Sequence, residues 1–340
     1  MILAGDVGGT KTLLGLFTWL NGRPHPVREA AYPSQESPSL EAIIEKFLAE
    51  GSQTVHRCAV GVAGPVVEGK SHVVNLRWPV AEKTLARALG TPNVRVLNDL
   101  EATAWGIPVL PASKLVNLTP GLRPRRGNAA LIAAGTGLGT ALLFWDGEKH
   151  VPSAGEGGHQ SFAPRDDLEI DLLRYLRERL DRVSVERIVA GPGFSVIYQF
   201  LIDSGRGKES PLMTRRLAEG DPNAAVSEAG VTGDDPVAER AVDIFVSLYG
   251  AVAGDLALVG RATGGVFVGG GIAPKILAKL RMGKFLESFR SKGRLSPLLE
   301  AIPVKVIVEP RTALLGAAAA AASIPVSLSR TKRARRRGKR

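Results

Sequence analysis

A glycine-rich turn set between two apolar segments occurs twice in this chain, and it limits the folds that the chain can adopt. The first copy is AGDVGGTKTLLGLF at residues 4–17, and the second is AGTGLGTALLF at residues 134–144. In each copy the pattern predicts a strand, a tight turn and a second strand. Because such a unit recurs far along the chain, we expect two related domains that face each other across a cleft.

The rest of the chain alternates short apolar segments with helical patterns. Glycine accounts for 39 of the 340 residues, which is more than the usual share of about 7% and indicates many tight turns. Strands that alternate with helices predict an α/β fold. Residues 205–236 are polar and contain Gly, Pro and Asp, so we expect a surface excursion there.

Cysteine content and hydropathy restrict the protein's environment. Cys58 is the single cysteine, which excludes an intramolecular disulfide or a Cys-clustered zinc site and fits a reducing cytoplasm. No apolar run reaches the roughly 18 residues of a membrane helix. The first residues, MILAGDVGGT, lack the basic segment of a signal peptide. We therefore predict a cytoplasmic protein without a membrane partner.

The net charge of +11 is concentrated at the C-terminus. The last twelve residues, SRTKRARRRGKR, hold eight Lys or Arg and no acid, so the remainder has 36 basic and 33 acidic residues. We predict that residues 324–340 form a disordered basic tail. The tail is either a solubilising or localising appendage or a site of non-specific, salt-sensitive nucleic-acid binding, and we favour the appendage.

The first two glycine turns have the chemistry of phosphate sites. Gly5–Thr10 is not a P-loop, because Thr10 stands where glycine is required and a strand follows. Gly135–Gly139 misses the dinucleotide fingerprint, because Thr140 replaces its last glycine. Even so, convergent backbone N–H groups and Thr hydroxyls bind anions, and Asp6 could hold a hydrated Mg²⁺. The alternative is that both are tight hairpin turns.

A third glycine run, Gly269–Gly271, follows an apolar strand and precedes a helix. Backbone can approach a flat ligand there, and the helix N-terminus favours anions. A tight turn between strand and helix is an equally good interpretation.

Three polar groups are candidates for a ligand site. Asn98 and Asp99 follow a buried strand, where α/β folds place ligand sites, although Asp99 could instead cap a helix over 100–106. Glu156 and His159 share a glycine-bounded loop that could present polar groups to a polyhydroxylated ligand, or could simply be a solvated turn. Glu186 could join such a site, pair with the adjacent arginine or lie on a helix surface.

Taken together, these motifs resemble the bacterial glucokinase family, ATP-dependent hexokinases of the actin-like sugar-kinase superfamily. They occur in the family's order and span almost the whole chain except the tail. The matching stretches are GDVGGT (5–10), Asn98-Asp99, AGTGLG (134–139), GEGGH with FAP (155–164), SVERIVAGPG (184–193), GGVFVGGGI (265–272), GR (293–294) and LLG (314–316).

The resemblance implies a fold and an assembly. It implies two actin-like (ribonuclease H-like) α/β domains with a sugar and ATP cleft between them. The small domain would comprise residues 1–109 and 312–323, and the large domain residues 110–311. A homodimer is implied by the family only.

The resemblance also implies a reaction, in which ATP and D-glucose give ADP and glucose 6-phosphate as the first step of glycolysis. Asp99 would be the general base that takes the proton from the sugar 6-hydroxyl. The implied sugar ligands are Asn98, Asp99, Glu156, His159 and Glu186. Asp6 would lie near Mg²⁺, and the implied ATP-binding residues are Gly5, Asp6, Val7, Gly8, Gly9, Thr10, Gly135, Thr136, Gly137, Gly269, Gly270 and Gly271.

Departures from the family pattern leave alternatives open. Lys11 stands where the family usually has Asn, as in the related ROK (repressor, open reading frame, kinase) group, and Gln160-Ser161 replaces the common Val-Asp. The alternatives are a kinase of another hexose or a glucokinase that uses polyphosphate. A non-catalytic sugar-responsive regulator is not expected, because only four residues precede Gly5 and such a regulator would need a helix-turn-helix segment there.

Overall fold

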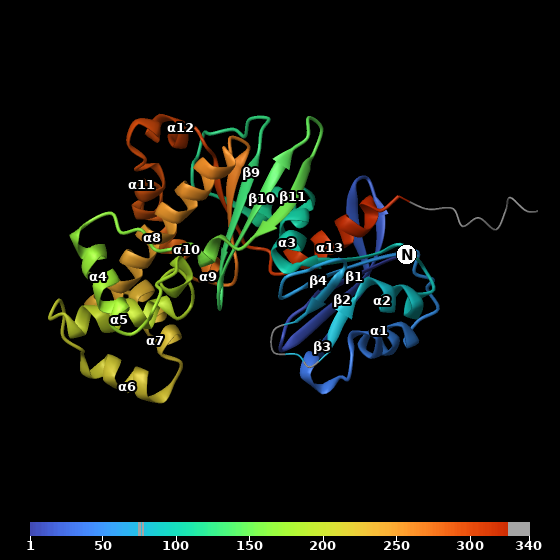
Figure 1. Cartoon of the computed structure of the whole chain (residues 1–340), viewed down its shortest axis with the longest axis horizontal. Helices are drawn as coiled ribbons and strands as arrows, with labels where there is room; N and C mark the ends of the chain where they lie inside the picture. Colours follow the sequence, from blue (N-terminus) through green and yellow to red (C-terminus); the bar gives the residue numbers. More distant parts are fainter. Residues whose placement is uncertain (74–75, 77, 326–340) are drawn as a thin grey trace, which may run out of the picture. The chain divides into compact units, whose positions relative to one another are not determined.

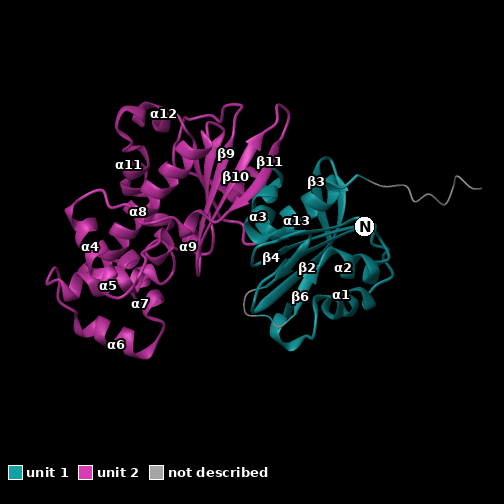
Figure 2. Cartoon of the chain, in the orientation of Figure 1, with its two compact units in different colours: residues 1–110, 311–340 teal, residues 111–310 magenta. Residues whose placement is uncertain are grey.

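The computed structural model describes residues 1–73, 76 and 78–325, which form two compact units (Figure 2). Unit 1 comprises residues 1–110 and the chain from Arg311 onward, and unit 2 comprises Pro111–Pro310. The predicted domain limits remain a prediction. Of the predicted basic tail, residues 326–340 lie outside the described residues.

Unit 1 is built on a five-stranded sheet in the order β3-β2-β1-β4-β7. The first three strands form an antiparallel meander, and β4 and β7 add to it in parallel with β1. The carboxyl ends of β1, β4 and β7 therefore share one edge of the sheet. The strand bounds are β1 Ile2–Val7, β2 Lys11–Leu20, β3 Arg23–Pro33, β4 Arg57–Val62 and β7 Val94–Asn98.

Helices cover both faces of this sheet (Figure 1). Unit 1 also contains a short antiparallel hairpin of β5 (Lys70–His72) and β6 (Pro79–Ala81). One apolar cluster joins β1 and β4 to α1 and α2, and includes Leu3, Val60 and Phe47. A second cluster joins the opposite face to α3 and α13. The helices are α1 Leu40–Ala49, α2 Glu82–Leu89, α3 Asp99–Gly106 and α13 Thr312–Ser323.

Unit 2 repeats this strand plan. Its sheet has the order β11-β10-β9-β12-β13-β8, and its first five strands are again an antiparallel meander extended by two parallel strands. The shared plan confirms the predicted α/β class and the predicted internal repeat. The bounds are β8 Leu115–Asn117, β9 Ala129–Ala134, β10 Leu138–Trp145, β11 His150–Gly155, β12 Gly265–Gly269 and β13 Val304–Ile307.

Helix α8 is the central helix of unit 2. It carries the fully buried rings of Phe245 and Tyr249 in the main apolar core. By length and composition α8 could cross a membrane, but 56% of its most apolar window is buried inside the fold, as in the core helix of a soluble protein. The helices of unit 2 are α4 Asp167–Arg177, α5 Gly193–Asp203, α6 Pro211–Glu219, α7 Pro222–Thr232, α8 Pro236–Gly260, α9 Ile272–Lys275, α10 Leu277–Arg281, α11 Lys284–Arg290 and α12 Ser296–Glu300.

The segment of residues 205–236, where we expect a surface excursion, is largely helical. Most of this segment forms α6 and α7, and each begins with a capping side chain followed by proline. Ser210 accepts a hydrogen bond from the N–H of Met213, and Asp221 accepts one from the N–H of Asn223. A polar composition therefore concealed two capped helices, because capping residues and turn residues are the same types.

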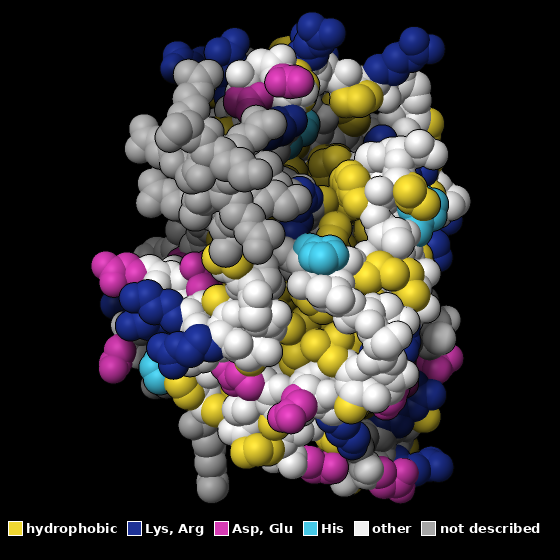
Figure 3. All heavy atoms as spheres, turned by 90° about the vertical axis from the view of Figure 1, so that its right-hand side faces the viewer, with side chains coloured by type: hydrophobic (Ala, Val, Ile, Leu, Met, Phe, Trp, Pro, Cys, Tyr) yellow, Lys and Arg dark blue, Asp and Glu magenta, His cyan; other side chains and the backbone are white. Residues whose placement is uncertain are grey.

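One face of the described residues has mixed charge. In the face shown in Figure 3, Lys and Arg side chains alternate with Asp and Glu, and apolar side chains show between them. This mixture agrees with the near balance of charge outside the last twelve residues.

In unit 1, the backbones of α3 and α13 cross in close contact. A Cβ added at Gly106 would lie 2.3 Å from the carbonyl oxygen of Thr312, and one at Gly316 would lie 1.8 Å from that of Ala102. Real side chains do not approach backbone so closely. Glycine at both positions therefore lets the C-terminal helix pack on the N-terminal part of the chain.

We expect Gly316→Ala to lower the free energy of unfolding of unit 1 by about 1–3 kcal/mol, because the added methyl forces the two helix backbones apart. Denaturant unfolding would measure the loss. Gly51→Ala is the matched control, since its Cβ would meet only the flexible side chain of Gln53. Equal stability of the two variants would contradict the close crossing.

Candidate functional site

Two carboxylates of unit 1 lie on the same side of its sheet. Asp6 precedes the last residue of β1 and pairs in register with Gly61, which pairs with Leu97. Asp99 begins α3 directly after β7. Burial raises the pKa of Asp6 to about 6; the charge of Asp99 adds to this rise and Lys11 opposes it. The ionised carboxylate of Asp6 is therefore costly to leave unpaired, and a cation beside it would stabilise it.

Asn98, rather than Asp99, is the cap of α3. Its Oδ1 accepts hydrogen bonds from the N–H groups of Leu100 (2.8 Å) and Glu101 (3.4 Å), and its Nδ2 donates to the carbonyl of Gly64 (3.1 Å). Asp99 is the first helical residue, and its Oδ1 accepts from the N–H of Leu100 at 2.9 Å. The alternative that Asp99 serves as the helix cap is therefore wrong.

The glycine loop between β1 and β2 is held by Ser34, which lies just beyond β3. The Ser34 hydroxyl donates to the carbonyl of Gly8 at 2.8 Å and lies 2.8 Å from the hydroxyl of Thr12. Its N–H donates to the carbonyl of Thr10 at 2.9 Å. Ser34 is fully buried. Sequence reasoning missed it, because no motif connects it to the loop.

The structure brings two of the predicted phosphate and nucleoside turns together in unit 2. Strands β9 and β12 are parallel neighbours. The turn Gly135–Gly137 follows β9, and Gly269–Gly271 ends β12 and continues beyond it. Gly270 has φ +81°, and a Cβ there would lie 2.2 Å from the carbonyl oxygen of Ala134. The two turns therefore share one edge of the sheet in close contact.

A buried tyrosine ties the two strands together below these turns. The hydroxyl of Tyr249 accepts a hydrogen bond from the N–H of Ala134 at 3.2 Å. It lies 3.3 Å from the carbonyl oxygens of both Ile132 and Gly269, to either of which it can donate. Tyr249 is fully buried, and burial raises the pKa of its phenol. The sequence offered no signal for this role beyond an aromatic residue in a helix.

Glu186 lies against the turn Gly135–Gly137. Its Oε2 accepts the N–H of Leu138 at 2.8 Å. The other end of the turn is held by the N–H of Gly191, which donates to the carbonyl of Gly135 at 2.8 Å. Among the described residues Glu186 forms no ion pair with the adjacent arginine, so that alternative is wrong. The segment around Glu186 instead forms hydrogen bonds to both ends of the turn Gly135–Gly137.

The loop that carries Glu156 and His159 packs on β10. The Thr140 hydroxyl donates to the carbonyl of Gly155 (3.2 Å) and accepts the N–H of Gly157 (3.0 Å). The Glu156 and His159 side chains are exposed. This loop contacts the short helical turn Val185–Arg187 that contains Glu186. The structure therefore places three predicted sugar ligands of unit 2 on adjoining segments.

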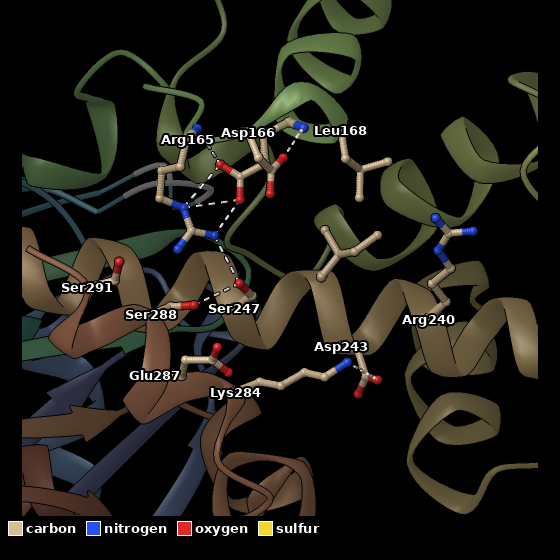
Figure 4. A pocket seen from close by; sticks show the side chains of 12 residues that line it. Arg165, Asp166, Leu168, Arg240, Asp243, Ser247, Lys284, Glu287, Ser288 and Ser291 are labelled. Atoms are coloured by element: carbon tan, nitrogen blue, oxygen red, sulfur yellow. Dashed lines mark hydrogen bonds and ion pairs between the residues drawn. The ribbon is translucent and has the colours of Figure 1, made fainter.

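A separate pocket of about 540 Å³ lies between α4, α8 and α11 of unit 2 (Figure 4). Arg165 at its rim donates to Glu169 and to the hydroxyl of Ser247, and Lys284 pairs with Asp243 at 2.7 Å. None of the predicted site residues lines this pocket. The charged side chains of this pocket largely pair with one another, and the pair of Lys284 and Asp243 links α11 to α8.

The described residues contain no group of three or more His, Cys, Asp or Glu side chains that could hold a metal ion.

Comparisons with known proteins agree on one family. The family model described as Glucokinase matches residues 3–324. A curated glucokinase from Trichormus variabilis is 40% identical, with 95% of this chain and 99% of that protein covered. One from Caulobacter vibrioides is 38% identical, with 94% of each covered.

Solved structures show the same fold. The crystal structure of a glucokinase from an Antarctic psychrotroph has a TM-score of 0.84 and 30% identity, and covers 94% of this chain and 98% of that chain. A ROK family glucokinase from Streptomyces griseus, solved with glucose and AMPPNP, has a TM-score of 0.60 and 23% identity over 94% and 99% of the two chains. The second likeness supports the fold alone.

We expect Tyr249→Phe to destabilise unit 2 by about 1–3 kcal/mol, because the buried N–H of Ala134 would lose its partner. Thermal or denaturant unfolding would measure the change. Tyr198→Phe is the matched control, since that hydroxyl is buried and has no partner among the described residues. We expect the control to be neutral or stabilising, and the opposite order would contradict the role of Tyr249.

Proposed function

This chain belongs to the glucokinase family, and we propose that it transfers the γ-phosphoryl group of ATP to the 6-hydroxyl of D-glucose. The family model spans nearly the whole chain, and curated relatives at 35–40% identity are named glucokinase. The products would be glucose 6-phosphate and ADP, and the reaction would serve as the first step of glycolysis. The observation that carries the mechanism is the position of Asp99 beside Asp6.

Asp99 is the proposed general base. It follows the carboxyl end of a buried parallel strand and is held there because Asn98 caps the helix that it begins. A base in phosphoryl transfer accepts the proton of the attacking hydroxyl late, so positioning matters more than a raised pKa. We propose that Asp99 orients the 6-hydroxyl and takes its proton.

Asp6 is the proposed magnesium contact. Its carboxylate is half-buried near that of Asp99. Burial and the charge of Asp99 both raise the pKa of Asp6, so the arrangement fits a nearby divalent cation held through water. Mg²⁺ bound there would neutralise charge on the phosphates of ATP.

Backbone N–H groups are the proposed phosphate contacts. In unit 1 these belong to the loop Gly5–Thr10, and in unit 2 to the turn Gly135–Gly137. The adjacent turn Gly269–Gly271 would lie against the adenosine, since a Cβ added at Gly271 meets nothing within 4 Å. Glycine-lined backbone of this kind can approach a phosphate or a flat ring closely.

Sugar hydroxyls are the proposed partners of Asn98, Glu156, His159 and Glu186. Carboxylates accept two hydrogen bonds from neighbouring hydroxyls, and a sugar that lacks one would leave a charged acceptor without its partner. Glu186 already uses one oxygen on the turn Gly135–Gly137. We propose that its other oxygen binds the sugar.

The environment and the assembly are also proposals. Cys58 is a buried thiol, and burial raises its pKa to about 12. A single cysteine in the chain fits a cytoplasmic protein without disulfides. We propose a homodimer, as the family implies, and light scattering of the purified chain tests this. Phosphorylation of another hexose and use of polyphosphate are the remaining alternatives for the activity.

We expect Asp99→Asn to lower kcat by at least about 100-fold, because an amide cannot accept the proton. A coupled assay of glucose 6-phosphate formation measures kcat, and circular dichroism checks the fold. Asp167→Asn is the matched control, because Asp167 is likewise the first residue of a helix capped by its neighbour. Turnover of Asp99→Asn at the rate of this control would refute the mechanism.

We expect the wild-type chain to use glucose with ATP more efficiently than any other pair in a panel of donors and sugars. The panel comprises glucose, mannose, fructose and N-acetylglucosamine, each with ATP and with polyphosphate, compared by kcat/KM. A higher kcat/KM for another sugar, or for polyphosphate, would replace the proposed substrate or donor.

A further inference from the structure

We propose that Thr140 is a positioning residue that sets the place of Glu156 and thereby the affinity for sugar. This inference rests on the proposed function, because Glu156 is taken as a sugar ligand. Thr140 lies in β10 opposite Gly155 of β11. It interrupts the dinucleotide-like pattern of the sequence, where a glycine would otherwise stand.

The Thr140 hydroxyl brackets Glu156. It donates to the carbonyl of Gly155 at 3.2 Å and accepts the N–H of Gly157 at 3.0 Å, so it holds the residue on each side of Glu156. The side chain of Thr140 is 4% exposed, whereas that of Glu156 is exposed. A buried hydroxyl thus fixes the backbone from which an exposed carboxylate projects.

The loop that carries Glu156 lies directly against β10. A Cβ added at Gly157 would lie 2.7 Å from the Thr140 hydroxyl, and one at Gly158 would lie 2.1 Å from the carbonyl of Leu138. The two glycines therefore bring the loop into direct contact with β10. Without the hydroxyl, the N–H of Gly157 would lose its partner, and the loop would shift to satisfy it.

A different observation assigns the same kind of role to Ser34 for the phosphate loop of unit 1. Its hydroxyl and N–H hold the carbonyls of Gly8 and Thr10. With these two carbonyls turned toward Ser34, the loop is held in one conformation. Because Ser34 is fully buried, it acts on the nucleotide through the loop and does not touch it.

The two positioning residues are expected to affect different substrates, so each variant is a control for the other. We expect Thr140→Val to raise KM for glucose about 3- to 10-fold and to leave KM for ATP within about twofold, given the usual net contribution of a hydrogen bond. We expect Ser34→Ala to raise KM for ATP by a similar factor and to leave KM for glucose within about twofold. Calorimetric Kd values for glucose and for AMPPNP check each KM.

Conservative variants separate positioning from general stability. Thr140→Ser keeps the hydroxyl and is expected to restore KM for glucose, whereas Thr140→Ala is expected to behave like Thr140→Val. If Thr140→Val does not fold, the comparison of Thr140→Ser with Thr140→Ala decides. Thr12→Val removes a neighbour of Ser34 without touching the two loop carbonyls, so it should affect KM for ATP less than Ser34→Ala does.

Specific outcomes would overturn the proposal. Thr140→Val or Thr140→Ala with a lowered unfolding midpoint but an unchanged Kd for glucose would show a merely structural hydroxyl. Equal effects of Thr140→Val on both substrates would have the same meaning. Failure of the proposed function is distinct, since the wild-type chain would then neither bind nor phosphorylate glucose.

Discussion

The parallel pairing of strands is the constraint on which the candidate site depends. In unit 2, β9 and β12 pair in parallel, so both strands end at the same edge of the sheet. The turns Gly135–Gly137 and Gly269–Gly271 follow these ends and are therefore in contact. In unit 1, the pairing of β1, β4 and β7 likewise brings Asp6 and Asp99 to one edge and one face. Parallel strands share a direction, so residues distant in sequence meet at their carboxyl ends.

Around these edges, side chains from neighbouring elements hold the glycine loops in place. Ser34 holds the first loop, Thr140 brackets Glu156, Glu186 binds the turn of unit 2, and Tyr249 ties β9 to β12. Glycine allows backbone to approach a ligand closely but leaves the loop with many conformations to lose. Hydroxyl and carboxylate groups that bind the loop backbone reduce this freedom before a ligand arrives. The preorganisation of a glycine-rich site therefore depends on side chains outside the glycine turns themselves.

Local sequence pattern predicts some structural elements of this chain and not others. The paired turns and their flanking strands were predictable, because apolar strands and glycine turns leave a strong local signal. Helices α6 and α7 do not stand out from the sequence, although Ser210-Pro211 and Asp221-Pro222 are cap and first-turn pairs, because the same polar residue types also form turns. The sequence does not distinguish Asn98 from Asp99 as the cap of α3, since adjacent Asn and Asp are equally good caps by type.

The sequence by itself determined the α/β class, the repeated strand-turn-strand unit, the family and the residue types available for phosphate and sugar. Each of these follows from periodicity, glycine placement or motif order, which are local or linear properties. Only the tertiary structure decided which neighbour each polar group uses: Ser34 on Gly8, Thr140 on Gly157, Glu186 on Leu138 and Tyr249 on Ala134. These pairs join segments that are separate along the chain, and a hydrogen bond between such segments exists only after packing has brought the donor and acceptor together.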